Sequence, residues 1–264
     1  MDLQLSGKLA LVTGSTGGIG LAIAAALAGE GAAVIINGRS KERVTEAIGK
    51  VRQKYPHVKL EPLIADLSAA KAVTQAVNAF PQVDILINNL GSYEPKPFEE
   101  ISDEDWQTLI ETNFMSGVRL SRHYLPKMRT KNWGRIIFIS SESGVNIPVE
   151  MIHYGVTKTM QLALARGLAE TTAGTAVTVN SILAGPTKSE GVEKFVGDLA
   201  KSRHVEPSVV EREFFETVRP SSLLKRFAST EEVAALVAFV ASPLSSATNG
   251  AALRVDGGTI RSIL

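Results

Sequence analysis

The sequence predicts an α/β protein built as one parallel sheet of about seven strands with helices on both faces. Two patterns predict this class. Short runs rich in apolar and β-branched residues alternate along the chain with longer segments of helical periodicity. The short runs are also almost continuously apolar, as strands covered on both faces must be. Together these patterns indicate βαβ units joined into a single doubly wound domain.

Each element follows from its local pattern. Strands are predicted at Leu9–Thr13, Ala33–Asn37, Lys59–Ile64, Ile85–Asn88, Arg135–Ser140, Ala176–Ile182 and Ala252–Val255. Helices are predicted at Gly18–Gly29, Lys41–Lys54, Ala69–Phe80, Asp103–Arg129, Ile152–Glu170 and Thr230–Ala241. Ser102 and Ser229 precede acidic first turns, which is typical of helix N-termini. Because right-handed crossovers align the strands, a ligand site of the Rossmann type is expected at their carboxyl ends.

One segment interrupts the alternation. Residues 187–224 are polar, with short helical patterns at Val192–Lys201 and Ser208–Val218. A long insertion directly after a strand end is typical of a segment that covers a site. We therefore expect residues 1–264 to form a single dinucleotide-binding and catalytic domain in which 187–224 act as a substrate-covering lid.

Composition excludes several function classes. The chain of 264 residues has a net charge of +1, so no basic surface for nucleic acid is expected. It contains no cysteine, and its 4 histidines are scattered, so we expect no metal site. No apolar run reaches the ~20 residues of a membrane helix. The N-terminus enters a strand-like run without a leader pattern. A cytoplasmic enzyme is the resulting expectation.

A glycine-rich turn follows the first predicted strand. Gly14, Gly18 and Gly20 lie between that strand and the next helix. Glycines allow a tight turn and the close approach of a pyrophosphate, which the helix N-terminus then stabilises. The spacing is G-x-x-x-G-x-G, and glycine clusters also occur in ordinary strand-to-helix turns. The order of strand, turn and helix favours cofactor binding.

The end of the second predicted strand indicates which nicotinamide cofactor binds. An NAD site typically has a carboxylate here to bind the ribose 2′-hydroxyl. This chain has Gly38 and Arg39 instead, and a guanidinium is a good partner for a 2′-phosphate. The alternative is a solvated arginine at the start of a loop. The sequence favours NADP(H), with NAD(H) left open.

Tyr154 and Lys158 lie one helical turn apart, and Ser141 precedes them by thirteen and seventeen residues respectively. A free tyrosine has a pKa of about 10, too high for efficient acid–base catalysis. A neighbouring ammonium favours the phenolate and lowers that pKa. A tyrosine tuned in this way can transfer a proton to a carbonyl oxygen or from an alcohol. The alternative, a buried tyrosine beside a surface lysine, is common for this spacing alone.

The whole set of motifs, from about Leu5 to Gly258, resembles the classical branch of the short-chain dehydrogenase/reductase family. The motifs are Thr13–Gly20, Asp66-Leu67, Asn88-Asn89-Leu90-Gly91, Asn113, Ser141, Tyr154/Lys158, Gly185-Pro186-Thr187 and Val255–Gly258. The resemblance implies a catalytic set of Asn113, Ser141, Tyr154 and Lys158. It implies that cofactor contacts come from Gly14, Ser15, Thr16, Gly18, Ile19, Gly20, Arg39, Asp66, Leu67, Asn88, Gly91, Tyr154, Lys158, Pro186 and Thr187.

The resemblance also implies a role for each catalytic residue. Tyr154 donates the proton in reduction. Lys158 lowers the pKa of Tyr154 and holds the nicotinamide ribose. Ser141 hydrogen-bonds the substrate oxygen, and Asn113 holds a water that joins Lys158 to solvent. Two positions depart from the family pattern, since Leu90 replaces an alanine and Ala184 replaces a proline.

The sequence leaves the substrate open. A ketone and its secondary alcohol are the expected small-molecule pair, in a fairly apolar pocket lined by Tyr93, Val145, Ile147, Pro148, Val149, Met151, Phe214 and Phe215. One alternative is a 3-oxoacyl-acyl-carrier-protein reductase, although Thr172–Thr175 lacks the arginine such enzymes use to dock the carrier. Another is a nucleotide-binding scaffold without catalytic activity. Apolar stripes on Asp103–Arg129 and Ile152–Glu170 predict a homo-oligomer, a tetramer or a dimer.

Overall fold

A computed structural model describes residues 2–263, and its centre is a seven-stranded parallel sheet. The strand order is β3-β2-β1-β4-β5-β6-β9. The strands are β1 (Leu9–Val12), β2 (Ala33–Gly38), β3 (Leu60–Ile64), β4 (Ile85–Asn88), β5 (Gly134–Ser141), β6 (Val177–Ala184) and β9 (Ala252–Val255). The predicted single-domain, doubly wound sheet is confirmed. The order reverses between β1 and β4, where such folds form a crevice for ligands.

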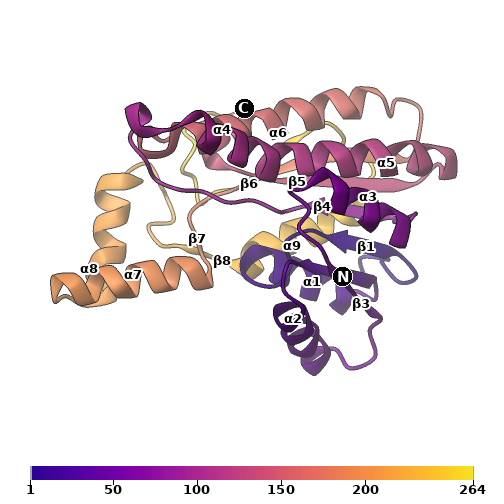
Figure 1. Ribbon diagram of the computed structural model, residues 1–264, viewed down its shortest axis with the longest axis horizontal. Helices are drawn as coiled ribbons and strands as arrows, with labels where there is room; N and C mark the ends of the chain where they lie inside the picture. Colours follow the sequence, from indigo (N-terminus) through magenta and orange to yellow (C-terminus); the bar gives the residue numbers. More distant parts are fainter. Residues whose placement is uncertain (1, 264) are drawn as a thin grey trace.

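Helices cover both faces of the sheet (Figure 1). One face is covered by α1 (Gly18–Gly29), α2 (Lys41–Lys54) and α9 (Thr230–Ala241), and the other by α3 (Ala70–Ala79), α5 (Ser116–Lys131) and α6 (Ile152–Glu170). Each layer has its own apolar core. Ile23 and Val237 lie in the first core, and Tyr124 and Phe138 in the second. The central strands β4, β5 and β6 are therefore buried on both sides, whereas the edge strands β3 and β9 are partly exposed.

The long helix predicted at Asp103–Arg129 contains a wider turn that the sequence pattern does not reveal. It consists of α4 (Asp103–Ile110), a π-helical turn η2 (Glu111–Met115) and α5. A capping box between Ser102 and Asp105 begins α4, as its acidic first turn predicts. Asn113 lies in the π turn, and such turns are frequent at functional sites because they redirect side chains and carbonyls.

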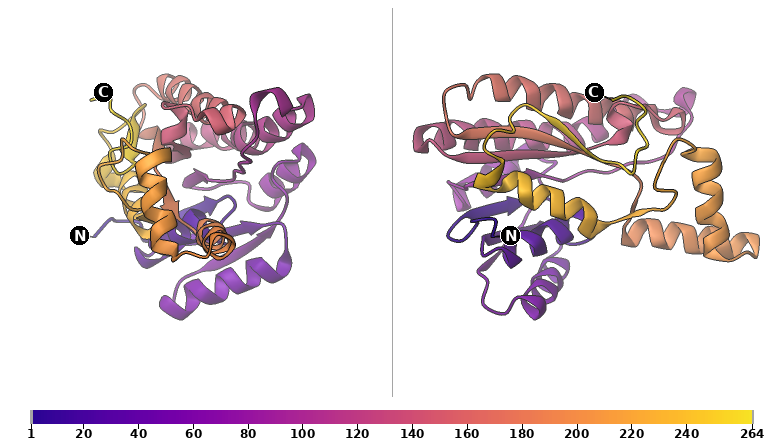
Figure 2. Two further views of the ribbon diagram at one scale, coloured as in Figure 1. Left: turned by 90° about the vertical axis from the view of Figure 1, so that its left-hand side faces the viewer. Right: turned by 180° about the vertical axis from the view of Figure 1, so that it is seen from behind.

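Residues 187–224 form a helical projection beyond the carboxyl ends of the strands (Figures 1 and 2). It starts at β7 (Thr187–Lys188), which pairs with β8 (Ala228–Ser229). It continues through α7 (Glu190–Arg203), α8 (Pro207–Glu213) and a π turn η5 (Phe214–Val218). Both predicted helical pieces are present, with longer bounds.

Candidate active site

The glycine-rich turn is held from two sides by asparagine side chains. The amide N–H of Gly14 donates to Asn37 Oδ1 at 3.0 Å. Asn89 Nδ2 donates to the carbonyls of Thr13 and Gly14 at 2.9 and 3.1 Å. Gly14 has φ +60° and Gly18 φ +54°, a region that glycine adopts without strain. The turn is therefore a fixed strip of bare backbone at the N-terminus of α1.

The geometry around this turn fits a dinucleotide. A Cβ on Gly20 would lie 2.5 Å from both Asn89 Nδ2 and the Gly14 carbonyl, so the glycine is required for the loop to close. A Cβ on Gly91 would lie 3.5 Å from Lys158 Nζ, so bare backbone also borders the ammonium. Leu90, a departure from the family pattern, packs directly over Gly14 with its Cα 3.3 Å from where a Cβ would be.

The other predicted cofactor residues gather around the carboxyl ends of the strands. Arg39 is exposed after β2, and Thr16 packs against Gly38. The Ser15 hydroxyl is turned inward and donates to the Val12 carbonyl. Ile19 packs against the first core and Leu67 lies inside the second, so only their backbones face the loop side. Pro186 and Thr187 connect β6 to the projection.

Asp66 and Asn88 make hydrogen bonds within the protein that the sequence motifs do not predict. Asp66 is exposed and accepts hydrogen bonds from the backbone and hydroxyl of Ser68. Asn88 is buried and donates to Ser121 of α5 at 3.4 Å. Its Oδ1 has no hydrogen-bond partner among the described residues. Asn88 therefore joins the sheet to α5, while Asp66 presents a carboxylate at the loop after β3.

Sequence reasoning gave no role to two residues of this region: Asn37, and Asn89, which it named only as part of the motif at 88–91. Asn37 is 1% exposed and uses its Nδ2 to bond the carbonyls of Leu63 and Ala65 on the next strand. The sequence could have indicated Asn37, because it ends an otherwise apolar strand. A polar side chain buried at such a position is stable only when its groups are hydrogen-bonded. Both amide side chains hold the glycine-rich turn in place.

The structure brings the four residues predicted to be catalytic to one place. Ser141 ends β5, Tyr154 and Lys158 lie in the first turns of α6, and Asn113 lies opposite in the π turn. Lys158 Nζ donates to the Ile139 carbonyl of β5 at 2.9 Å and lies 5.6 Å from the centre of the Tyr154 ring. The preceding Ser140 instead bonds the backbone carbonyl of Lys158 at 2.9 Å.

Asn113 serves as a bracket between the loop after β4 and α6. Its Nδ2 donates to the Ser92 carbonyl at 2.9 Å and to Thr157 Oγ1 at 3.0 Å, and its Oδ1 accepts from the Ser92 amide at 2.8 Å. All polar atoms of the side chain are therefore used by the protein. Only its backbone carbonyl is left to act toward Lys158, and that carbonyl accepts from the side chain of Gln161.

Burial controls the protonation of the tyrosine and the lysine. It raises the pKa of Tyr154 to about 12, although the Ser141 hydroxyl opposes this shift. It lowers the pKa of Lys158 to about 8. The expected lowering of the Tyr154 pKa by Lys158 is absent, because desolvation dominates and the ammonium lies over the ring. At neutral pH the phenol keeps its proton, the state needed to protonate a carbonyl oxygen.

An ion-pair network ties the projection to the Ser141 turn. Arg219, beyond η5, donates from Nε to Glu142 Oε1 at 2.8 Å and from Nη1 to Glu150 Oε1 at 3.1 Å. Arg219 and Glu142 are both buried. Breaking such a pair leaves an uncompensated buried charge, so it fixes the C-terminal end of the projection firmly.

Exposed apolar side chains border Tyr154 on the approach from solvent. Tyr93 contacts it edge-on with ring centres 6.0 Å apart, and Val145 and Val149 are exposed on the Ser141–Tyr154 connection. Phe214 stacks on Phe227 and Phe215 meets Phe227 edge-on, so both belong to an aromatic cluster of the projection. Their place in the apolar lining stays a prediction.

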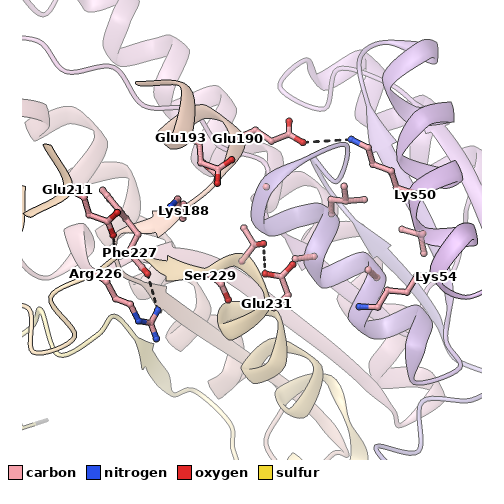
Figure 3. Close-up of a pocket in the computed structure, with 17 residues that line it drawn as sticks. Lys50, Lys54, Lys188, Glu190, Glu193, Glu211, Arg226, Phe227, Ser229 and Glu231 are labelled. Atoms are coloured by element: carbon pink, nitrogen blue, oxygen red, sulfur yellow. Dashed lines mark hydrogen bonds and ion pairs between the residues drawn. The ribbon is translucent and has the colours of Figure 1, made fainter. Parts of the chain in front are cut away.

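A hollow of about 680 Å³ lies between α1, α2, α9 and the start of α7, away from Tyr154 (Figure 3). Nearly half of its lining residues are charged, and Lys50 of α2 pairs there with Glu190 of α7 at 3.8 Å. Exposed pairs of this kind contribute about 0–1 kcal/mol. This pair therefore adds little to the β7–β8 pairing that holds the N-terminal end of the projection.

Two absences hold for residues 2–263. No cluster of histidine and acidic side chains there could hold a metal ion. None of the helices in that range combines the length and apolar character needed to cross a membrane.

Comparisons with known proteins all match this chain to dehydrogenases, oxidoreductases or reductases. The family model for short chain dehydrogenases matches residues 8–199. The uncharacterized oxidoreductase YvaG of Bacillus subtilis (strain 168) is 48% identical over 263 residues, 100% of both chains. The 3-oxoacyl-(acyl-carrier-protein) reductase FabG of Aquifex aeolicus (strain VF5) is 33% identical over 98% of this chain and 99% of the relative. L-sorbose reductase from Gluconobacter frateurii, complexed with NADPH and L-sorbose, superposes with a TM-score of 0.93 at 31% identity over 100% of both chains.

The buried ammonium predicts a pH-dependent stability. Because folding lowers the pKa of Lys158 from 10.5 to about 8, the unfolded chain binds more protons between these values. Below about pH 8 the lysine is charged in the folded protein, and the full cost of burying that charge lowers the free energy of unfolding. This cost disappears as the pH rises toward 10.5, the pKa of the lysine in the unfolded chain. We expect the unfolding free energy of the wild type, relative to that of Lys158→Met, to rise by about 3 kcal/mol across this window. Urea denaturation of both proteins at several pH values measures it, and a constant difference would contradict a desolvated cation.

Proposed function

The chain belongs to the short-chain dehydrogenase family, and on that premise we propose that it interconverts a ketone and a secondary alcohol with NADP(H). The observation that carries the proposal is the convergence of Ser141, Tyr154 and Lys158 beside the bare backbone of Gly91. The similarity to a reductase complexed with NADPH and L-sorbose supports both the cofactor and a ketone substrate.

The chain's own residues account for the proton and the orientation of the substrate. When bound, the nicotinamide supplies or accepts the hydride. Tyr154, protonated at neutral pH, donates its proton to the carbonyl oxygen. Ser141 hydrogen-bonds the same oxygen and holds it near the phenol. The Lys158 ammonium stabilises the negative charge left on the phenol, and it borders Gly91, on the side where the nicotinamide ribose would bind.

The preference for NADP(H) over NAD(H) rests on the end of β2. Arg39 is exposed there, no carboxylate stands in the turn, and Arg43 lies close to Gly17. A 2′-phosphate carries the charge that these guanidinium groups bind well, whereas a ribose hydroxyl gives them little to bind.

A carrier-protein reductase is the second candidate, because FabG of Aquifex aeolicus is similar over almost its whole length. The surface that would dock a carrier protein gives this candidate little support. Lys131 at the end of α5 pairs with Asp84, and the loop after α6 has no arginine. A scaffold without activity is a third reading, disfavoured because it has no need for a buried lysine beside a tyrosine. Turnover of small ketones and acyl-carrier substrates with NADPH, followed by nicotinamide absorbance, separates the three.

Three further features belong to the proposal. Residues 1–264 act as one catalytic domain, with 187–224 as the lid. The protein assembles as a homo-oligomer through the outer stripes of α5 and α6, and it works in the cytoplasm. Arg219 anchors the lid at its C-terminal end and the β7–β8 pairing holds its start, whereas the ion pair that joins α7 to α2 is exposed and weak, so α7 is the moving part.

Tyr154→Phe tests the proposed acid. Removing only the hydroxyl should reduce turnover by about 10²–10⁴-fold, because the transferable proton is lost. NADPH affinity, measured by nicotinamide fluorescence, should stay unchanged. Tyr124→Phe is the control, since it removes another buried phenol that only bonds the Phe80 carbonyl. Turnover by Tyr154→Phe at the wild-type rate would exclude the mechanism.

Arg39→Ala tests the cofactor preference. We expect NADPH affinity to fall by about tenfold or more while NADH affinity is kept, because only the 2′-phosphate loses its charged partner. Arg52→Ala, an exposed arginine in the last turn of α2, controls for net charge. An equal loss for both cofactors would contradict the assignment.

Hydrogen exchange tests the lid. Amides of residues 187–213 should exchange fast without ligand and become protected when NADPH and a ketone analogue are bound. Amides of residues 214–224 should be protected from exchange both with and without ligand. The aromatic cluster of Phe214, Phe215 and Phe227 and the ion pair of Arg219 hold this part of the segment. Equal protection of 187–213 in both states would show that the segment is not a lid.

A further inference from the structure

A buried glutamine connects the two sides of the candidate site. Gln161 lies on α6 three residues after Lys158 and is 1% exposed. Its Nε2 donates to the backbone carbonyl of Asn113 in the π turn, and its Oε1 accepts from Lys158 Nζ at 3.5 Å. Burying a polar side chain so completely is costly unless its groups are bonded, and here both ends of the amide are.

The chemistry of the neighbours allows only one orientation of this amide. The carbonyl of Asn113 can only accept, so it requires the NH₂ end. The ammonium of Lys158 can only donate, so it requires the oxygen. A flipped amide would place two acceptors against each other and two donors against each other. The orientation therefore follows from the network and not from the placement of nearly identical atoms.

Gln161 also limits where the ammonium can point. An ammonium has three N–H donors. One of those on Lys158 bonds the Ile139 carbonyl at 2.9 Å, and a second bonds Gln161. The remaining side of Nζ faces Gly91, where a Cβ would lie only 3.5 Å away. With two directions held by β5 and α6, the third is directed at the bare backbone that borders the cofactor side.

The same contact adds to the role expected for Asn113. The family resemblance predicts that this residue holds a water joining Lys158 to solvent. In this chain the Asn113 carbonyl also accepts the Gln161 amide, so one link from it to Lys158 runs through a side chain, and its second lone pair stays open to the expected water. A neutral amide donates and accepts hydrogen bonds but does not pass protons at neutral pH. Such a link orients the ammonium and does not relay its proton.

We propose that Gln161 is a positioning residue that holds the Lys158 ammonium in its working direction by joining it to the π-turn carbonyl of Asn113. The proposal rests on the proposed function, because the direction matters only if Lys158 serves Tyr154 and the cofactor. It also gives the π turn a purpose in this chain, since the turn presents a backbone carbonyl toward α6.

The charged and titratable groups around this site are few. Tyr154 is on α6 itself. Glu142 on the turn after β5, Arg219 from the lid end and Tyr93 from the loop after β4 act on Tyr154 through space. For Lys158, burial is the dominant influence. A negative charge introduced at position 161 should therefore act on the pKa of Lys158 directly, whereas the carboxylate of Glu142 acts on Tyr154.

Two substitutions separate the halves of the contact. Gln161→Glu keeps an acceptor for Lys158 and, when ionised, loses the donor for Asn113. Gln161→Leu removes both at a similar size. Thr159→Val is the matched control, because it deletes a hydroxyl hydrogen bond to Gly144 and Gly155 from the same helix without touching Lys158 Nζ. Thermal melts verify folding, and Gln161→Glu carries the test if Gln161→Leu does not fold.

The first readout is the titration of Lys158 in the protein without added cofactor, followed by NMR of ¹³C-labelled lysine and assigned with Lys158→Met. Losing the acceptor should lower the pKa of Lys158 in Gln161→Leu, and the added carboxylate should raise it in Gln161→Glu. Thr159→Val should match the wild type. Identical titrations in all four proteins would overturn the proposal, whether or not a substrate is known.

The second readout is catalysis of ketone reduction with NADPH. Gln161→Leu should lower kcat/KM by about tenfold or more, the effect of losing a hydrogen bond to a charged group. The fall of activity at high pH should move to lower pH in Gln161→Leu and to higher pH in Gln161→Glu. Unchanged profiles with an active wild type would overturn the positioning role alone. A wild type that reduces no ketone would overturn the proposed function and leave the titration as the test of the contact.

Discussion

The arrangement of the site depends on one buried cation, the ammonium of Lys158. Transferring a charge out of water is costly, and the low pKa of this lysine measures that cost. The fold offsets it with fixed acceptors, a carbonyl of β5 and the amide of Gln161. These acceptors belong to the sheet and to α6, so the ammonium is held where solvent would otherwise let a long flexible side chain move. Its position then defines the space available beside Tyr154 and Gly91.

Around that cation, the backbone carries much of the polar chemistry. The π turn supplies a carbonyl to Gln161, and the glycine turn presents bare N–H groups at the N-terminus of α1. Asparagine side chains hold both regions in place: Asn113 brackets the loop after β4, while Asn37 and Asn89 bond the glycine turn. Amide side chains suit this task because each can donate and accept at once without carrying a charge. The site is thus positioned by neutral groups, and charge is concentrated where the chemistry needs it.

The sequence predicted the layers, the strands and most helices because apolar periodicity reports directly on burial. Periodicity could not reveal the π turn at Asn113, since one extra residue in a turn leaves the apolar stripe of the helix nearly unchanged. It did not single out Gln161, because a glutamine in a helix is ordinary until a buried cation and a free carbonyl lie beside it. The direction of the Tyr154 shift was missed for a related reason. Spacing shows that Lys158 is one turn away, but only the packed structure shows that desolvation outweighs the charge.

The burial that makes the charged Lys158 costly in free energy also decides whether Tyr154 donates or accepts a proton. A phenol kept neutral by desolvation is ready to give a proton, and it becomes a better base only when charge nearby is strengthened. The Lys158 ammonium lies 5.6 Å from the centre of the Tyr154 ring, and Arg219 is already committed to Glu142 and Glu150. Anything that keeps Lys158 charged at higher pH therefore extends the range in which the phenolate formed after proton transfer is stabilised. Control of this chemistry then lies less in the tyrosine than in the neutral amide that decides where its lysine points.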